Sequence, residues 1–452
     1  MKKIINTILI LFLLTSCEGF LEEKPSVDIV VPDTLQDLQA LLDNSSMNSS
    51  SGISVIGTDD IVTTQEGLLS LTNQITEGNS YLWEEEIFDG GTSSDWNTDY
   101  NNILTANLVL QLVEGVERTS QNENTWNGVK GAALFYRAFS YYDLLRLFAA
   151  QYDPASASTQ LGVPLRLNPE ITNKEPRADL ETCYQQIRMD LLSSLELLPD
   201  LPVAYPTRAS KWAVYGLLAR MSLQMGNYQE ALEFAAACLD IQSDLIDYNT
   251  LDPGATYPFS QFNQEVIFHS SMVTYSYISR PLIHVNPELV DLYDSTDLRK
   301  NLYLRPASEE GKNNFKGHYT GGRSGFSGIA LDEILLIRSE ALIRTGRVQE
   351  GMEELNRLLV KRYTIGEFEP LAADTELAAL RIVLEERRKS LVFRGHRWDD
   401  LRRLNREEEF QTTLVREIVG VTYTLLPNSN RYVYPIALNE LDYNDIQQND
   451  RK

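Results

Sequence analysis

The chain has 452 residues, with 64 acidic and 40 basic side chains and a formal net charge of −24. A chain this acidic repels nucleic-acid phosphates and anionic membrane surfaces, which argues against a nucleic-acid-binding function. Its three cysteines are too few for a disulfide framework or a zinc module. The length allows two or three domains, or one large helical body.

The amino end has the layout of an export signal. Lys2 and Lys3 precede a short apolar run over residues 8–14, far below the roughly 20 apolar residues that span a bilayer. The run continues into Leu-Thr-Ser-Cys, which resembles a bacterial lipobox ending at Cys17. We therefore expect a signal peptide over residues 1–16, lipidation of Cys17, and attachment to a membrane without crossing it.

The amino-terminal part of the remaining chain alternates helical and polar segments. After an extended tether to about Pro32, the spacing of apolar residues predicts a helix over residues 34–43. Residues 44–52 are Asn, Ser, Met and Gly, which predicts a polar loop without core residues. Helical spacing returns over 101–116 and is strongest over 128–150, where the apolar stripe is so wide that the helix must be buried.

Two helical hairpins share a sequence phrase. Gly-Asn-Tyr-Gln-Glu-Ala at 226–231 recurs as Gly-Arg-Val-Gln-Glu-Gly at 346–351. Each copy joins two predicted helices, 211–225 with 228–239 and 331–345 with 348–363, and a further helix is expected over 377–393. The recurrence predicts a mainly α fold in which tetratricopeptide-like helical pairs form a scaffold. Cys183 and Cys238 lie in apolar-periodic segments, so we expect two buried free thiols, although an exported chain could pair them.

A different kind of segment interrupts this scaffold. Residues 247–328 lack a helical period, and five prolines fall among many Gly, Ser, Tyr and Phe residues. This composition predicts long loops with short strands, inserted into the helical scaffold. Binding residues commonly lie on loops that a rigid scaffold holds in place.

Motifs along nearly the whole mature chain resemble the SusD/RagB family, in the order that the family has them. They are Phe20-Leu21-Glu22, the helix from Arg137 to Phe148, Gly162-Val163-Pro164-Leu165, Arg208 to Arg220, Glu265-Val266-Ile267-Phe268, Arg338-Ser339-Glu340-Ala341 with Asn356, Glu386-Arg387, Phe393, Gly395, Arg397-Trp398, Asp400-Leu401-Arg402 and Tyr434-Pro435-Ile436. No single block is decisive, but the ordered set is specific. We interpret Glu386-Arg387 and Arg397 as helix-linking ion pairs around Trp398.

The resemblance implies one SusD-like nutrient-binding domain over residues 17–452, from a cell-surface lipoprotein of the Bacteroidetes outer membrane. Such a protein caps a SusC-like TonB-dependent β-barrel transporter and delivers a nutrient to it, commonly a glycan and sometimes a peptide. Ser390 and Arg394 stand where the family usually has acidic residues. That departure puts a local charge network in doubt.

Catalytic signatures are weak by comparison. The four histidines, His269, His284, His318 and His396, form no His-Glu-x-x-His motif or close pair, so we expect no metal, and no cofactor is expected either. No Gly-x-Ser-x-Gly motif supports a hydrolase. The acidic run 84–86 is interpreted as a solvated turn, because adjacent carboxylates rarely oppose each other across a substrate. We therefore expect a binding protein and not an enzyme; a protein-interaction scaffold without a small ligand and a surface glycosidase remain as alternatives.

The ligand site is expected where aromatic rings accompany polar side chains on loops, because sugar rings stack on aromatic faces while their hydroxyl groups need polar partners. One such stretch runs from Tyr81 through Trp83 and Trp96 to Asn101, and another contains Tyr275, Tyr277, Phe315, Tyr319 and Arg323. Trp83, Tyr275, Tyr277 and Tyr319 are the predicted ligand contacts, with burial in a loop core as the equally weighted alternative. For Trp96, four residues before Tyr100, burial is the preferred interpretation.

Overall fold

The computed structural model of the chain describes residues 32–88 and 90–452. Cys17 and the predicted signal peptide lie outside the described residues. The α-helices are α2 (Leu35–Leu42), α3 (Gln65–Leu69), α4 (Gln74–Tyr81), α5 (Ser94–Val113), α6 (Glu123–Phe148), α7 (Leu180–Leu195), α8 (Lys211–Gln224), α9 (Tyr228–Ile241), α10 (Pro287–Asp291), α11 (Arg299–Tyr303), α12 (Leu331–Arg344), α13 (Val348–Leu359), α14 (Glu376–Ser390), α15 (His396–Leu404) and α16 (Leu438–Asn444).

The strands are short and pair two by two. They are β1 (Ser49–Ser50) with β6 (Ser271–Met272), β2 (Ile61–Val62) with β7 (His284–Val285), β3 (Leu161–Pro164) with β4 (Arg177–Asp179), β5 (Val266–Phe268) with β10 (Ile329–Ala330), β8 (Leu304–Pro306) with β9 (Asn313–Phe315), and β11 (Leu414–Ile418) with β12 (Val421–Leu425). The β1–β6 pair is parallel and the others are antiparallel. Two of these pairs, β1–β6 and β2–β7, join a strand of the 247–328 segment to the amino-terminal part of the chain.

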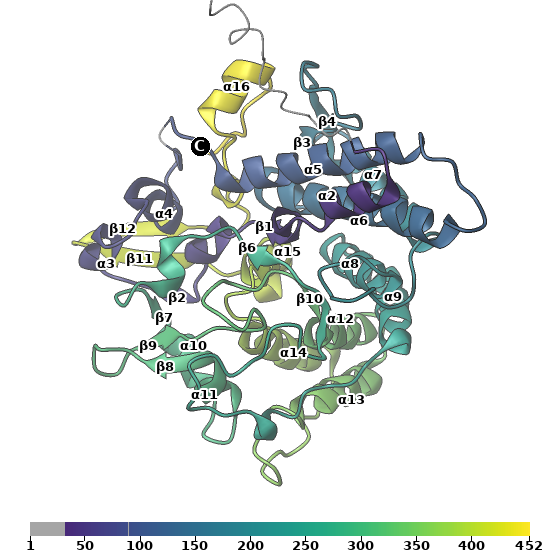
Figure 1. Cartoon of the computed structure of the whole chain (residues 1–452). Helices are drawn as coiled ribbons and strands as arrows, with labels where there is room; N and C mark the ends of the chain where they lie inside the picture. The colour runs from purple at the N-terminus through teal and green to yellow at the C-terminus, as the bar shows by residue number, and fades with distance from the viewer. Residues whose placement is uncertain (1–31, 89) are drawn as a thin grey trace, which may run out of the picture.

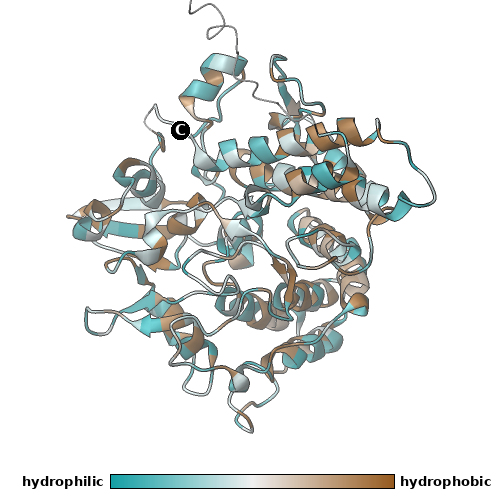
Figure 2. Ribbon diagram, viewed as in Figure 1, coloured by the Kyte–Doolittle hydropathy of each residue, from teal (hydrophilic) through white to brown (hydrophobic). Residues whose placement is uncertain are grey.

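The predicted helical scaffold is confirmed. α5 packs on α6, α6 on α7, α8 on α9 and α12 on α13, and α12 also packs on α9 and α14. Figure 1 shows these pairs in one half of the molecule, with α3, α4 and the β11–β12 hairpin on the opposite side. Figure 2 shows hydrophobic residues concentrated on α6, α8 and α12, which lie at the centre of the helical half. No helix within residues 32–88 and 90–452 is long and apolar enough to cross a membrane.

The two repeated phrases do form the inter-helix turns. Gly226 has φ +76° and Gly346 has φ +82°, a left-handed conformation that glycine adopts without a steric penalty. Cys183 and Cys238 are buried free thiols, as predicted.

The prediction of a loop without core residues over 44–52 is wrong. Met47 and Ser50 are each 1% exposed, and this stretch contributes β1 to a sheet with β6. Its polar groups are satisfied inside the protein: the side-chain amide of Asn48 donates to the carbonyls of Thr207 and His269 (2.8 and 3.0 Å). Small polar residues are therefore buried here because each finds a hydrogen-bond partner.

Glu386, Arg387 and Arg397 all form ion pairs, but only the pair of Arg387 with Asp400 links two carboxy-terminal helices, α14 and α15. Glu386 pairs with a residue of α11, and Arg397 pairs with half-buried Asp59 in the turn before β2. Arg387 pairs with Asp400 (2.9 Å), Glu386 with Arg299 (2.7 Å) and Arg397 with Asp59 (2.8 Å), and Trp398 is 1% exposed.

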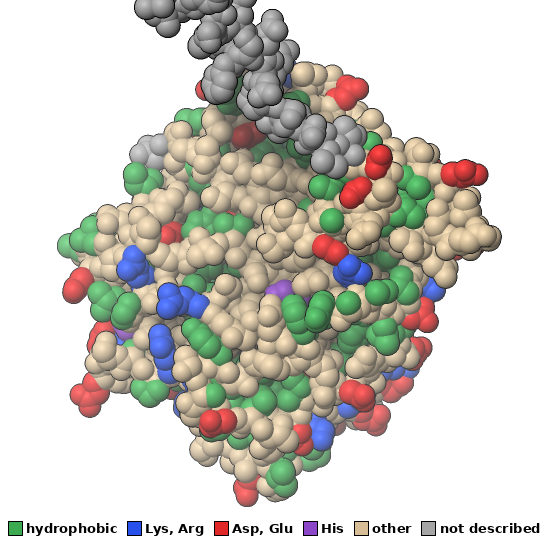
Figure 3. Space-filling view, viewed as in Figure 1, with side chains coloured by type: hydrophobic (Ala, Val, Ile, Leu, Met, Phe, Trp, Pro, Cys, Tyr) green, Lys and Arg blue, Asp and Glu red, His purple; other side chains and the backbone are tan. Residues whose placement is uncertain are grey.

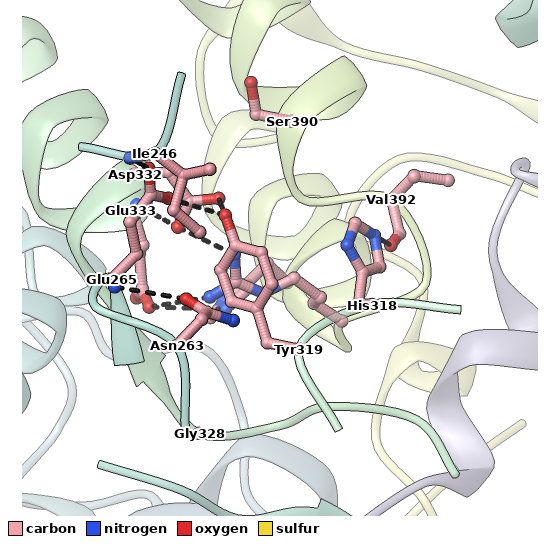
Figure 4. Close-up of polar contacts among 12 residues, drawn as sticks. Ile246, Asn263, Glu265, His318, Tyr319, Gly328, Asp332, Glu333, Ser390 and Val392 are labelled. Carbon is pink, nitrogen blue, oxygen red and sulfur yellow. Dashed lines mark hydrogen bonds and ion pairs between the residues drawn. The ribbon is translucent and has the colours of Figure 1, made fainter. Parts of the chain in front are cut away.

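Ser390 and Arg394, which put a local charge network in doubt, both take part in one. Arg394 pairs with Asp332 at 2.8 Å, and the Ser390 hydroxyl accepts a hydrogen bond from Arg299 at 2.8 Å. Figure 4 shows the cluster on the Asp332 side. The network persists because a partner for Arg394 comes from α12, far away in the sequence.

Glu340 on α12 offers a test of this buried charge network. It is 0% exposed and accepts hydrogen bonds from Arg403 at both oxygens (2.6 and 2.8 Å) and from Arg344 (2.8 Å). Burial opposes its charge, but the two guanidinium groups overcome that effect and lower the pKa of Glu340 from 4.5 to about 2. A carboxyl group with a lowered folded-state pKa stabilises the fold above its unfolded-state pKa, and that stabilisation is lost as the pH falls toward 2.

We predict that Glu340→Gln lowers the free energy of unfolding at pH 7 by about 3 kcal/mol, because it leaves buried arginines without their anion. The variant should also lose less stability than the parent between pH 4.5 and 2. Urea unfolding across this pH range measures both effects. Glu350→Gln, which breaks the exposed pair with Arg347, is the control and should change little. Equal acid sensitivity of the parent and Glu340→Gln would contradict the assignment.

Candidate ligand-binding site

A hollow of about 490 Å³ lies where the segment 272–280 meets the amino end of α4 and the turn at 323–325. We call it the 272–280 hollow. Three elements from distant parts of the sequence form its wall, and hydroxyl groups of Thr72, Thr274, Ser276 and Ser324 are among its lining groups. Figure 3 shows basic side chains gathered left of centre on the face that carries β2 and β7 (Figure 1).

Tyr275 and Tyr277 form the base of this hollow. Their rings stack with centroids 6.3 Å apart and an interplanar angle of 18°. The Tyr275 hydroxyl donates to Asp95 (2.5 Å) and the Tyr277 hydroxyl to the carbonyl of Gly52 (2.7 Å). With exposed fractions of 8% and 3%, both rings are buried, so the alternative of burial holds for them as it does for Trp83. Both residues line the predicted site, and their contact with a ligand stays a prediction.

Asp95 holds this base in place from below. One carboxylate oxygen accepts from the backbone N–H of Gly52 (2.7 Å), and the other accepts from Tyr275. Burial raises the pKa of Asp95 from 3.8 to about 6, although the Tyr275 hydroxyl and the Gly52 N–H act in the opposite direction. The carboxylate thus ties α5, the segment after β1 and the 272–280 segment together.

Glu77 on α4 holds the 276–280 turn at the edge of the hollow formed by α4. It is 1% exposed and accepts from the Ser276 hydroxyl (2.8 Å) and from the backbone N–H groups of Tyr277 (2.8 Å) and Asn73 (3.3 Å). Three donors therefore occupy this carboxylate, which orders the 276–280 turn against α4.

Trp83 does not lie in the 272–280 hollow. Its ring is 2% exposed, its N–H donates to the carbonyl of Gly57 (2.8 Å), and the Arg416 guanidinium lies 4.3 Å from its ring centroid. The expected exposure of this ring is wrong, because a cation from the β11 strand covers it. We assign Trp83 to the scaffold.

Tyr319 is also part of the interior. It is 0% exposed, and its hydroxyl donates to Glu265 at 2.6 Å and lies 3.3 Å from an oxygen of Asp332. Figure 4 shows the ring directed into the buried charge cluster. The expected exposure is therefore wrong here too: the phenol group satisfies buried carboxylates, a role that a tyrosine fills more readily than other aromatic residues. Phe315, 6% exposed and stacked on Phe393 at 4.5 Å, is likewise buried.

The first predicted stretch lines a second hollow, of about 370 Å³, between α5, the segment after β3 and α16. Trp96 is 3% exposed and packs against Tyr100 with ring centroids 4.8 Å apart, so the preferred interpretation of Trp96 as buried is confirmed. Asn101 is exposed at the rim. Only the part of the first stretch from Trp96 to Asn101 lines this second hollow; Trp83 lies in neither hollow, and the same is true of Phe315 and Tyr319 from the other stretch.

Sequence reasoning missed Thr72, Glu77 and Arg280. Arg280 donates to the Thr72 hydroxyl at 2.7 Å. The two residues are 208 positions apart in the sequence, so no local pattern indicates this contact. Arg323, named as a polar neighbour of the predicted aromatic residues, does line the 272–280 hollow. Within residues 32–88 and 90–452 no group of His, Cys, Asp and Glu is arranged to hold a metal ion.

Comparisons with known proteins agree on one family. A family model described as "Starch-binding associating with outer membrane" matches residues 19–223, and a model of the SusD family matches residues 329–450. The chain is 28% identical to SusD-like protein P2 of Formosa agariphila over 89% of this chain and 91% of that protein. It also resembles SusD-like protein P25 of the same organism, with 26% identity over 59% of this chain and 51% of that protein.

Solved structures have the same fold. A SusD superfamily protein from Bacteroides thetaiotaomicron superposes with a TM-score of 0.74 at 23% identity, covering 92% of this chain and 100% of that one. A putative sugar binding protein from Bacteroides vulgatus gives a TM-score of 0.73 at 22% identity, over 92% and 98% of the two chains. The protein belongs to the SusD/RagB family. The segment 272–280 lies between the two stretches that the family models match.

Proposed function

We propose that the protein is an outer-membrane binding protein that holds a glycan in the 272–280 hollow. The observation that carries this proposal is a concave site rich in hydroxyl and guanidinium groups over a base of two tyrosines that the scaffold fixes in place. Sugars need such donors and acceptors beside ring surfaces. The family model with the words "Starch-binding associating with outer membrane" supports both the ligand class and the location.

The positions of the carboxylates at this site favour glycan binding over glycan hydrolysis. A glycoside hydrolase needs two carboxyl groups flanking an accessible bond. Here Glu77 is held by three donors, and Asp95 lies behind Tyr275, with 1% and 0% of their surfaces exposed. Neither is positioned to protonate or attack a glycan in the hollow. A scaffold without a small ligand, in turn, would leave the hollow and its arginine side chains without a role.

The location we propose is the outer face of the outer membrane, through a lipid on Cys17. Cys17 follows a short apolar run, and Glu18, Glu22 and Glu23 come soon after it. In lipoproteins of the resembling family, acidic residues near the lipidated cysteine accompany export to the cell surface. The proposed partner is a SusC-like TonB-dependent β-barrel transporter, which would take the glycan from the hollow; family membership supports this pairing.

If Cys17 carries a lipid anchor, its removal should change the cell fraction in which the protein is found. Cys17→Ala should move the protein from the membrane fraction to the soluble fraction, because the chain then lacks its acyl attachment. Immunoblots of fractionated cells measure this, and protease treatment of intact cells should digest the parent protein. Retention of Cys17→Ala in the membrane fraction would contradict the anchor, and full protection of the parent would contradict the outward orientation.

The transporter predicts a stable complex. Affinity purification of the protein after mild detergent extraction should recover a large β-barrel protein in comparable amount, identified by mass spectrometry. Repeated recovery of the protein alone, under conditions that preserve other outer-membrane complexes, would contradict the partnership.

Glycan binding in the hollow predicts a local steric effect. Thr274→Trp places a bulky ring in the hollow and should weaken the affinity for the best glycan of a panel about tenfold or more, measured by calorimetry. Thr422→Trp, at an exposed position of β12, is the matched control and should bind like the parent.

Asn101→Trp, at the rim of the second hollow, should also bind like the parent. Loss of binding by Asn101→Trp with normal binding by Thr274→Trp would place the site in the second hollow. A panel of neutral and charged glycans that all fail to bind the parent would reject the proposed function.

A further inference from the structure

The charged side chains of the 272–280 hollow are Glu77, Arg280 and Arg323. The chain as a whole has 24 more acidic than basic residues, so a site in which arginine side chains outnumber carboxylates departs from the average of the protein. The three groups also differ in how much of their charge reaches the hollow.

Glu77 presents little of its charge to a ligand. Its carboxylate is 1% exposed and accepts from a hydroxyl group and two backbone N–H groups, which compensate its negative charge from the protein side. Asp95, the next carboxylate behind the wall, is 0% exposed and separated from the hollow by the ring of Tyr275.

The two arginines are in the opposite situation. Arg323 is exposed, and neither Arg323 nor Arg280 forms an ion pair with any residue in 32–88 or 90–452. Arg280 donates one N–H to the Thr72 hydroxyl at 2.7 Å, and its Nε–H is buried without an acceptor among those residues. By contrast, Arg388 and Arg397 are both paired with Asp59.

A guanidinium group with unused donors is suited to an oxyanion. Its planar fork matches the two oxygens of a carboxylate or sulfate, and hydrogen bonds between opposite charges are stronger than neutral ones. The neighbouring hydroxyl groups of Thr274, Ser276 and Ser324 suit the uncharged hydroxyl groups of the same sugar. Figure 3 shows several basic side chains left of centre, and a locally positive surface would attract an anionic ligand.

We propose that the 272–280 hollow selects an anionic glycan, one that carries uronate carboxylates or sulfate esters, and that Arg280 and Arg323 bind its anionic groups. This inference rests on the proposed function and adds the substrate class to it. A uronate carboxylate is planar and a sulfate ester is tetrahedral, but both present a pair of anionic oxygens to a guanidinium group, and the experiment distinguishes them.

The test is calorimetry at about 50 mM salt, where surface charge is weakly screened. The probes are two matched pairs: tetragalacturonate with its methyl ester, and a sulfated galactan oligosaccharide with its desulfated form. We expect one anionic member to bind at least tenfold more tightly than its neutral counterpart, and the preference to shrink as salt is raised. The pair that shows the preference identifies the oxyanion.

Variants of the two arginines test whether these residues cause the preference for the anionic probe. Arg280→Gln and Arg323→Gln should each weaken binding of the anionic probe about three- to tenfold and weaken binding of the neutral probe clearly less, so that the ratio of the two affinities falls. Arg305→Gln is the matched control: Arg305 is exposed on β8, outside the hollow, and has no ion pair within the described residues. Thermal melting should show that all three variants are folded.

Three results would overturn the inference, and they can be told apart. Equal affinity for the charged and neutral members of both pairs, with glycan bound, rejects the anionic ligand but leaves glycan binding standing. An anionic preference that survives in both arginine variants places its origin outside the hollow. Absence of any glycan binding rejects the proposed function itself, and the inference with it.

Discussion

The structure depends on arginine side chains that are buried together with their carboxylates. Arg362 and Glu265 are both 0% exposed and form two hydrogen bonds, of 2.8 and 2.9 Å. Glu265 also accepts from Tyr319 and from the backbone of Ile246, so one carboxylate connects the end of α13, the entry to β5 and the loop before β10. Removing one partner of such a pair leaves an uncompensated charge in an apolar interior. This lowers the free energy of unfolding by far more than an exposed ion pair contributes to it.

This constraint explains how long loops keep a defined shape in the 247–328 segment. Few hydrophobic residues recur there with a regular period, yet the segment is held at several points by polar contacts with the helices. Asp95 and Glu77, both buried, bind the 272–280 segment at two of these points. The hollow is therefore preorganised, because its base and one wall are fixed by groups that are already satisfied without a ligand.

The helices could be predicted from the sequence, but the solvent exposure of aromatic residues could not. Periodic apolar residues and a glycine between two helical segments are local sequence signals, and they correctly placed the hairpins at Gly226 and Gly346. Both glycines have a positive φ in the structure. Whether Trp83 is covered depends on Arg416, and whether Tyr275 is anchored depends on Asp95, 180 positions away. The serine-rich stretch 44–52 was misjudged for the same reason, since its partners, such as Asp143 for Ser51, lie in distant helices.

If a glycan binds in the 272–280 hollow, it rests on a base that is already formed. A crystal structure of the protein with its best-binding glycan would show this. We expect density for a sugar between the 272–280 segment and the 323–325 turn, with the hydrogen bond from Tyr275 to Asp95 unchanged. A sugar bound at the second hollow or elsewhere on the surface, with the 272–280 hollow empty, would contradict this expectation.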